Sequence, residues 1–194
     1  MKLASIPVRS GLALLVIAVL LAIFRPWVVA PLDGEGKPSL GPQRFDAEAF
    51  AARVWDERLP SHIAAAVSLA QASSAPAFLK GEGVVVSVDT SSRVGVAMVD
   101  IDPQDGEADV TLSLGPVVTG SALRDALGLA FADFDTQVQY ANVSANLNRR
   151  AIAASPLLAA PQALEGKRVS FVGAGTTSAG GGVRLTPVRL AVLP

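Results

Sequence analysis

"GEGVVVSVDTSSRVGVAMVDID", residues 81–102, is the stretch of this chain that decides its fold. Apolar and polar side chains alternate on both sides of a Thr-Ser-Ser turn, a pattern typical of two strands that each bury one face. Three more strand-like runs follow, at residues 108–118 ("ADVTLSLGPVV"), 166–175 ("GKRVSFVGAG") and 183–193 ("VRLTPVRLAVL"). We therefore predict five strands.

Helical patterns cover residues 45–72, 121–129 and 135–154. The first precedes the strands, and the other two separate the third strand from the fourth. Asp46 is expected to cap the first helix, and Pro60 to kink or split it after Leu59. The order of helix, three strands, helical insert and two strands predicts an α+β domain built on a five-stranded OB-like Greek-key β-barrel, with sharp strand bends at Gly83 and Gly95. A two-sheet β-sandwich with helices is the alternative.

The N-terminus predicts a signal anchor over residues 1–30. Lys2 and Arg9 precede "GLALLVIAVLLAIF", residues 11–24, and a positive stretch before a short apolar one is characteristic of an export signal. Pro31 directly follows the best cleavage position, so we expect an uncleaved anchor that crosses the inner membrane once through residues 11–29. Cleavage is the alternative.

The positive charges before the anchor predict that the rest of the chain lies outside the cytoplasm. Residues 31–44, "PLDGEGKPSLGPQR", are rich in proline, glycine and charge, and we interpret them as a linker. Residues 45–194 then form the expected periplasmic α+β domain.

Composition excludes several classes of function. The formal net charge is -1, and Phe171 is the one aromatic residue in the strand-like runs, so we expect no nucleic-acid binding. The chain has no cysteine and a single histidine, His62, which removes thiolate and histidine-cluster metal sites. We interpret the acidic residues between Asp100 and Glu107 as a hairpin turn rather than a calcium loop. No metal or cofactor is expected.

"GPVVTGSALRDAL", residues 115–127, is the first candidate site. Its glycines have the spacing of a phosphate-binding loop, but Ser121 stands where such a loop has lysine. We therefore interpret the stretch as a corner where a strand ends and Ser121 caps the next helix. Arg124 and Asp125 lie side by side there, and they either hold the corner together or contact a ligand or partner.

A polar stripe on the helical insert is the second candidate site. Its members recur at three- or four-residue spacing and are Asp135, Gln139, Asn142, Asn146 and Arg149. The opposite face is expected to carry Phe134, Val138, Ala141 and Ala145, with Tyr140, Val143 and Leu147 alongside. A solvated helix face explains such a stripe, but a hydrogen-bonding surface for a partner or a sugar would also use these amides.

Several stretches together resemble one known family. They are "FDAEAFAARVWDERLP", "SRVGVAMVDIDPQDGEADVTLSLGPVVTGSALRDAL", "FADFDTQVQYANVSANLN" and "GKRVSFVGAG". They resemble the Domain of Unknown Function 2291 family of predicted periplasmic lipoproteins over residues 45–192. The resemblance implies an envelope accessory to sugar ABC transporters of the ribose and xylose type, and it implies no catalytic residues. The chain departs from a lipoprotein in having no cysteine to acylate.

We therefore expect a non-enzymatic, membrane-tethered periplasmic accessory protein, with a sugar ABC transporter or its solute-binding protein as its partner. The alternative is a carbohydrate hydrolase of the envelope that uses Asp125, Asp133 or Asp135 as paired acids. That mechanism requires two carboxylates about 5–10 Å apart in a cleft.

Overall fold

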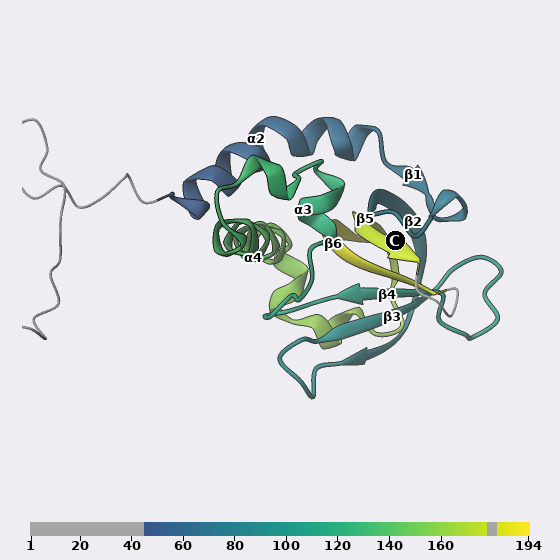
Figure 1. Cartoon of the computed structure of the whole chain (residues 1–194). Coiled ribbons are helices and arrows are strands. Elements are labelled where there is room, and N and C mark those ends of the chain that lie inside the picture. Colours follow the sequence, from purple (N-terminus) through teal and green to yellow (C-terminus); the bar gives the residue numbers. More distant parts are fainter. Residues whose placement is uncertain (1–44, 178–181) are drawn as a thin grey trace, which may run out of the picture. The chain divides into compact units, whose positions relative to one another are not determined.

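The computed structural model describes residues 45–177 and 182–194 (Figure 1). The expected signal anchor at 1–30 and linker at 31–44 lie outside the described residues. Among the helices of the two described ranges, none is both long and apolar enough to span a membrane.

The strands form a closed barrel, as the alternation of the sequence predicts. The barrel strands are β2 (Ala77–Asp89), β3 (Val96–Asp100), β4 (Val110–Ser113), β5 (Arg168–Thr177) and β6 (Val183–Val192). A two-residue strand, β1 (Val67–Ser68), pairs with β2 outside the barrel, giving the order β1-β2-β3-β4-β6-β5 with β2 also paired to β5. The β4–β6 pair is parallel and every other barrel pair is antiparallel. This is the five-stranded OB topology, and the prediction of an OB-like barrel is confirmed.

Strand β2 closes the barrel because it pairs with two other strands, β3 and β5. Residues 77–84 pair with β5, and residues 84–89 pair with β3. At the crossing, a Cβ atom on Gly83 would collide with the carbonyl oxygen of Asp100 and lie 2.7 Å from Cγ1 of Val99. Only glycine leaves room for the backbones to approach this closely. The sharp bend expected at Gly83 is therefore a close strand crossing.

Three helices cover one side of the barrel (Figure 1). They are α2 (Ala47–Ala64), α3 (Ala122–Ala126) and α4 (Gln137–Ala153), with short 3-10 turns η1 (Leu69–Gln71), η2 (Phe131–Asp133), η3 (Pro156–Ala159) and η4 (Pro161–Leu164) between elements. Asp46 caps α2 as predicted, since its Oδ1 accepts hydrogen bonds from the backbone N–H groups of Glu48 and Ala49 at 3.0 and 2.9 Å. Helix α2 runs unbroken through Pro60, so the expected split does not occur. It ends at Ala64, before the predicted limit of residue 72.

The domain has two apolar cores that meet across the barrel wall. The barrel interior is filled by side chains that include Leu79, Val85, Val99, Leu112 and Phe171. The second core lies between the helices and the outer face of the barrel, where Val54, Leu123, Val143, Leu147 and Val188 are buried. The barrel is therefore a filled scaffold, and the helices are attached to its outer surface.

Aromatic rings join the beginning of α2 to the segment before α4. Phe45 lies 5.4 Å from Phe50 and 5.8 Å from Phe134, measured between ring centroids. Phe134 in turn lies 5.3 Å from Tyr140, which lies 5.7 Å from Phe131. Ring pairs at these separations contribute favourable edge and offset contacts beyond the area that they bury. This ring cluster holds the first residue of the described domain against α4.

Gly83→Ala should lower the free energy of unfolding by about 1–3 kcal/mol, because the new methyl group overpacks the crossing of β2 and β3. Ser87→Ala is the matched control, since Ser87 is exposed on the same strand and its replacement should change stability by less than about 0.5 kcal/mol. Urea denaturation of both variants measures the difference. Equal stability of the two variants would contradict the close crossing.

Candidate functional site

The corner at residues 115–127 is held by two polar side chains from the buried face of α4. Ser144 Oγ donates a hydrogen bond to the carbonyl of Gly120 at 2.9 Å, and Asn148 Nδ2 donates to the same carbonyl at 3.1 Å and to that of Val118 at 3.3 Å. Gly120 has a φ of +99°, a conformation that favours glycine. Helix α4 thus supplies hydrogen-bond donors to two carbonyls of the corner from a face that is otherwise apolar.

Arg124 and Asp125 form the centre of a small polar network beside this corner. Arg124 donates from Nε to Asp125 Oδ1 at 2.8 Å, and its guanidinium lies 3.4 Å from the ring centroid of Tyr140. Asp125 Oδ2 accepts a hydrogen bond from Ser121 Oγ at 2.6 Å. Tyr140 donates to Asp125 Oδ1 at 3.3 Å and to the carbonyl of Leu129 at 3.2 Å. The Ser121 hydroxyl therefore binds a side chain, and the backbone cap expected of it is absent.

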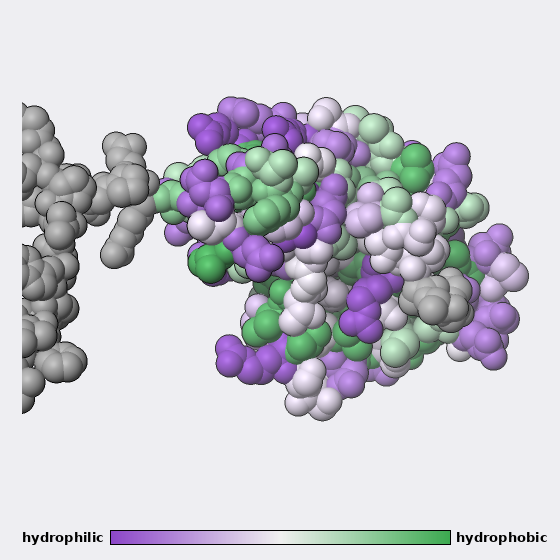
Figure 2. Space-filling view, in the orientation of Figure 1, coloured by the Kyte–Doolittle hydropathy of each residue, from purple (hydrophilic) through white to green (hydrophobic). Residues whose placement is uncertain are grey.

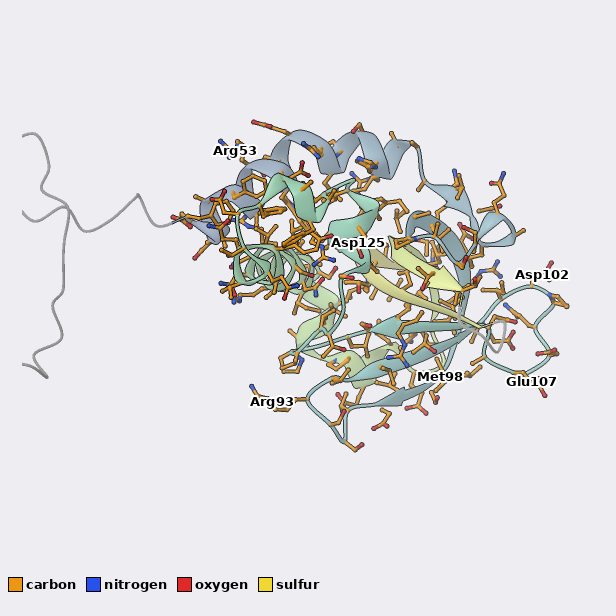
Figure 3. All side chains as sticks on the ribbon, in the orientation of Figure 1. Arg53, Arg93, Met98, Asp102, Glu107 and Asp125 are labelled. Carbon is orange, nitrogen blue, oxygen red and sulfur yellow. The ribbon has the colours of Figure 1, made fainter. Side chains whose placement is uncertain are left out.

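The two charged side chains of this network are largely shielded from solvent. The Arg124 side chain is 11% exposed and that of Asp125 is 29% exposed. The guanidinium is covered by the Tyr140 ring on one face and paired with a carboxylate at its edge, an arrangement that fixes its orientation. Arg124 thus ties α3 to α4, which is one of the two roles that the sequence leaves open for it. Figure 3 labels Asp125 on α3.

The phenol of Tyr140 has its pKa raised above the ordinary value of 10.0. Partial burial is the largest cause, because it disfavours the phenolate. The positive charge of Arg124 opposes this rise, and the negative charge and hydrogen bond of Asp125 add to it. Tyr140 stays neutral and remains a hydrogen-bond donor throughout the physiological pH range.

The three aspartates of the hydrolase alternative lie in different local settings. Asp125 belongs to the network with Arg124, and Asp133 Oδ2 accepts a hydrogen bond from the backbone N–H of Ala130 at 2.9 Å. Asp135 is exposed just before α4. The contacts of Asp125 and Asp133 are those of residues that stabilise helix ends and corners, and they give the paired-acid mechanism no support.

The polar stripe of α4 divides into a capping part and an exposed part. Gln139 Oε1 accepts a hydrogen bond from the backbone N–H of Asp135 at 3.0 Å, and Thr136 Oγ1 accepts one from that of Gln139 at 3.2 Å. Both residues cap the start of the helix. Further along, Asn146 Nδ2 donates to the carbonyl of Asn142 at 2.9 Å, and Arg149 donates to Asn146 Oδ1 at 2.6 Å.

A shallow hollow lies next to the exposed part of the stripe. It has a volume of about 230 Å³ and is lined by Glu48 of α2 and by Asn146, Arg149, Arg150 and Ala153 of α4. We call Asn142, Asn146, Arg149 and Arg150 the α4 polar surface. Amides and guanidinium groups beside a hollow can donate and accept hydrogen bonds to a partner, and the neighbouring Glu48 adds a carboxylate acceptor.

The expected opposite face of α4 is partly wrong. Val138 is 68% exposed, and Ala141 and Ala145 are exposed as well, whereas Phe134 is buried. Val143 and Leu147 are buried as expected, and Ala151, Ser144 and Asn148 complete the buried face. Sequence reasoning missed the last two because polarity alone assigns them to solvent. The one sequence feature that indicates their burial is their position on the same side of the helix as Val143, Leu147 and Ala151.

The outer face of β3 and β4 is where OB barrels commonly bind oligonucleotides and oligosaccharides. Met98, labelled in Figure 3, is 38% exposed on β3, and its cross-strand neighbours are Ser87 and Thr111. No aromatic side chain stands on either of these two strands, so they offer bases no stacking platform. Figure 2 shows hydrophobic residues on the visible face in small groups among polar ones.

Comparison with known proteins agrees with this architecture. A family model described as "Predicted periplasmic lipoprotein (DUF2291)" matches residues 65–191. A crystal structure of an OB-fold protein from Thermotoga maritima is similar with a TM-score of 0.54 and 16% identity, covering 77% of this chain and 99% of that one. This likeness supports the fold alone.

Two weaker structural likenesses are to OBody AM1L10 and OBody NL8, each bound to hen egg-white lysozyme. Both are 17% identical; the first has a TM-score of 0.30 and covers 63% of this chain and 81% of that one. The second has a TM-score of 0.31 and covers 60% and 94%. These scores are too low to support an argument. No curated protein matches the chain.

Arg124→Ala should lower the free energy of unfolding by about 1–3 kcal/mol, because it leaves Asp125 without its cation and uncovers the Tyr140 ring. Arg53→Ala is the matched control: Arg53 also lies over a ring, 5.4 Å from the centroid of Phe50, but it is exposed on α2. Its replacement should cost less than about 1 kcal/mol. Chemical denaturation of both variants decides whether the network stabilises the corner.

The raised pKa of Tyr140 should make stability fall at high pH. The contribution of Tyr140 is complete below the unfolded pKa near 10.0 and is lost as pH rises through the higher folded pKa. Tyr140 is the single tyrosine of the chain, so ultraviolet absorbance of the phenolate reports its titration directly. Tyr140→Phe should remove this part of the pH dependence. A folded-state titration at or below 10.0 would contradict the assignment.

Proposed function

Because this chain belongs to the Domain of Unknown Function 2291 family of predicted periplasmic lipoproteins, we propose that it is a non-enzymatic accessory protein of the periplasm that works by contact with a partner. The α4 polar surface carries this proposal. It combines Asn142, Asn146 and Arg149 of the sequence-predicted stripe with the neighbouring Arg150, and three of the four residues line a hollow. Arg124 and Asp125, in contrast, bond to each other in the partly buried network, and Gln139 caps the start of α4.

The partner that we propose is a carbohydrate ABC transporter or its solute-binding protein. The family resemblance supports this choice, because it implies an accessory to sugar uptake. The chemistry of the surface is compatible with it: two asparagines and two arginines can bond polar groups of a protein, and Arg is enriched at the centres of protein interfaces. The fixed position of α4 on the barrel presents these groups without reordering.

We also propose that the N-terminus holds the protein at the inner membrane. The family consists of predicted lipoproteins, but this sequence contains no cysteine that could be acylated. The largely apolar residues 11–29 then replace the lipid as the anchor, and residues 31–44 connect this anchor to the domain.

The tether is tested by fractionating cells that express the full chain. It should sediment with inner membranes and resist an alkaline wash, and replacing residues 1–30 with a cleavable export signal should release the domain into the soluble periplasmic fraction. A full chain that appears in the soluble periplasm, shortened at its N-terminus, would contradict the anchor.

The partner surface is tested by cross-linking the tagged full chain in membranes and identifying the captured proteins. We expect a component of a carbohydrate ABC transporter, with recovery lowered about fivefold or more by the double substitution Asn142→Ala and Arg149→Ala. Arg93→Ala is the control, because Arg93 is exposed at the tip of the β2–β3 hairpin, away from the helices (Figure 3). Capture without any transporter component, or equal recovery by both variants, would contradict the proposal.

A further inference from the structure

A larger cavity lies on the outer wall of the barrel. Its volume is about 690 Å³, within the range of small-molecule sites. Residues of β1, β2, β5 and β6 line it, together with Ala154 at the end of α4, and the polar groups among them are Ser68, Lys80, Glu82, Ser170 and Arg189. None of these residues belongs to the α4 polar surface or to the Arg124 network.

Strand register places two cations on the same wall of this cavity. Lys80 pairs with Val172 across β2 and β5, and Val172 pairs with Arg189 across β5 and β6. Directly paired residues point to the same face of a sheet, so the three side chains form one row. Two strand spacings separate the outer members of the row, or about 10 Å between their Cα atoms.

An irregularity in β6 turns an additional side chain toward the cavity. The register between β5 and β6 shifts between Val172 and Gly173. Val172 pairs with Arg189 and Gly173 pairs with Pro187, so Val188 has no partner on β5. An extra residue of this kind bends the strand and redirects neighbouring side chains. Val188 and Arg189 both line the cavity as a result, the first as part of its floor and the second as a charged wall.

The two cations have no partner inside the domain. Across residues 45–177 and 182–194, no ion pair or hydrogen bond engages the side chains of Lys80 and Arg189. The carboxylate in the cavity, Glu82, has Arg168 as its ion-pair partner at 4.0 Å. Lys80 and Arg189 therefore leave a local excess of positive charge beside an apolar floor of Val172 and Val188.

We propose that this cavity binds a small organic anion. Its carboxylate or phosphate lies between Lys80 and Arg189, where both cations can donate hydrogen bonds to it. Its apolar face rests on Val172 and Val188, and the Ser170 hydroxyl bonds a neighbouring polar group. The site lies on β2, β5 and β6, apart from the β3–β4 face that OB barrels commonly use. It is independent of the partner surface, so either proposal can fail alone.

Thermal unfolding of the full chain tests the site with four probes: D-glucuronate, glucose 6-phosphate, octanoate and neutral D-glucose. At least one anion should raise the Tm by about 5–10 °C at a hundredfold excess over its Kd, and D-glucose should not. The anion that acts identifies the ligand as a sugar acid, a phosphate ester or an aliphatic acid. High salt should weaken the effect because it screens the cations.

Variants show whether the effect belongs to this cavity. The double substitution Lys80→Met and Arg189→Met keeps the length of both side chains and should abolish the shift. Arg184→Met should retain it, because Arg184 is an exposed cation on the same strand β6 but outside the cavity. The proposal is overturned if no anion raises the Tm, or if the double variant, folded with its own thermal transition, gives the same shift.

Discussion

The domain depends on one strand pairing with two neighbours at a single crossing. Val84 of β2 is opposite both Asp100 of β3 and Arg168 of β5, and the adjacent Gly83 leaves room for the backbones to meet. Without this crossing β2 could bond to β3 or to β5 along its length, and the sheet would keep open edges. Closure removes those edges and seals an apolar interior filled by side chains. Recognition is therefore confined to the outside of the barrel.

The helices take their position from hydrogen-bond requirements as well as from apolar packing. The chain leaves β4 through a corner whose carbonyls at Val118 and Gly120 accept hydrogen bonds from Ser144 and Asn148 of α4. These bonds fix the rotation of α4 about its axis. The same rotation turns Arg149 outward, so contacts on the buried face of α4 determine which polar groups the helix presents to solvent.

Periodicity predicts most of the barrel, and it predicts the site less well. Alternation identifies β2 and β3, and the helical insert between the third and fourth barrel strands indicates the OB order. The buried and exposed faces of α4 are harder to predict. Apolar Val138 is exposed and polar Asn148 is buried, the reverse of what their polarity indicates. The cavity beside Lys80 and Arg189 depends on register and on an irregularity at Val188, which are properties of strand pairing across distant parts of the sequence.

If the proposed anchor holds this protein at a membrane, the ring cluster has a mechanical consequence. Force applied through the linker enters the domain at Phe45, whose ring contacts Phe50 and Phe134. The packed rings and α2 therefore bear the load first. The hydrogen bonds of the barrel bear it only after these contacts break. Peeling of the first helical turns would yield before the strands separate, which would lengthen the tether and leave the barrel intact.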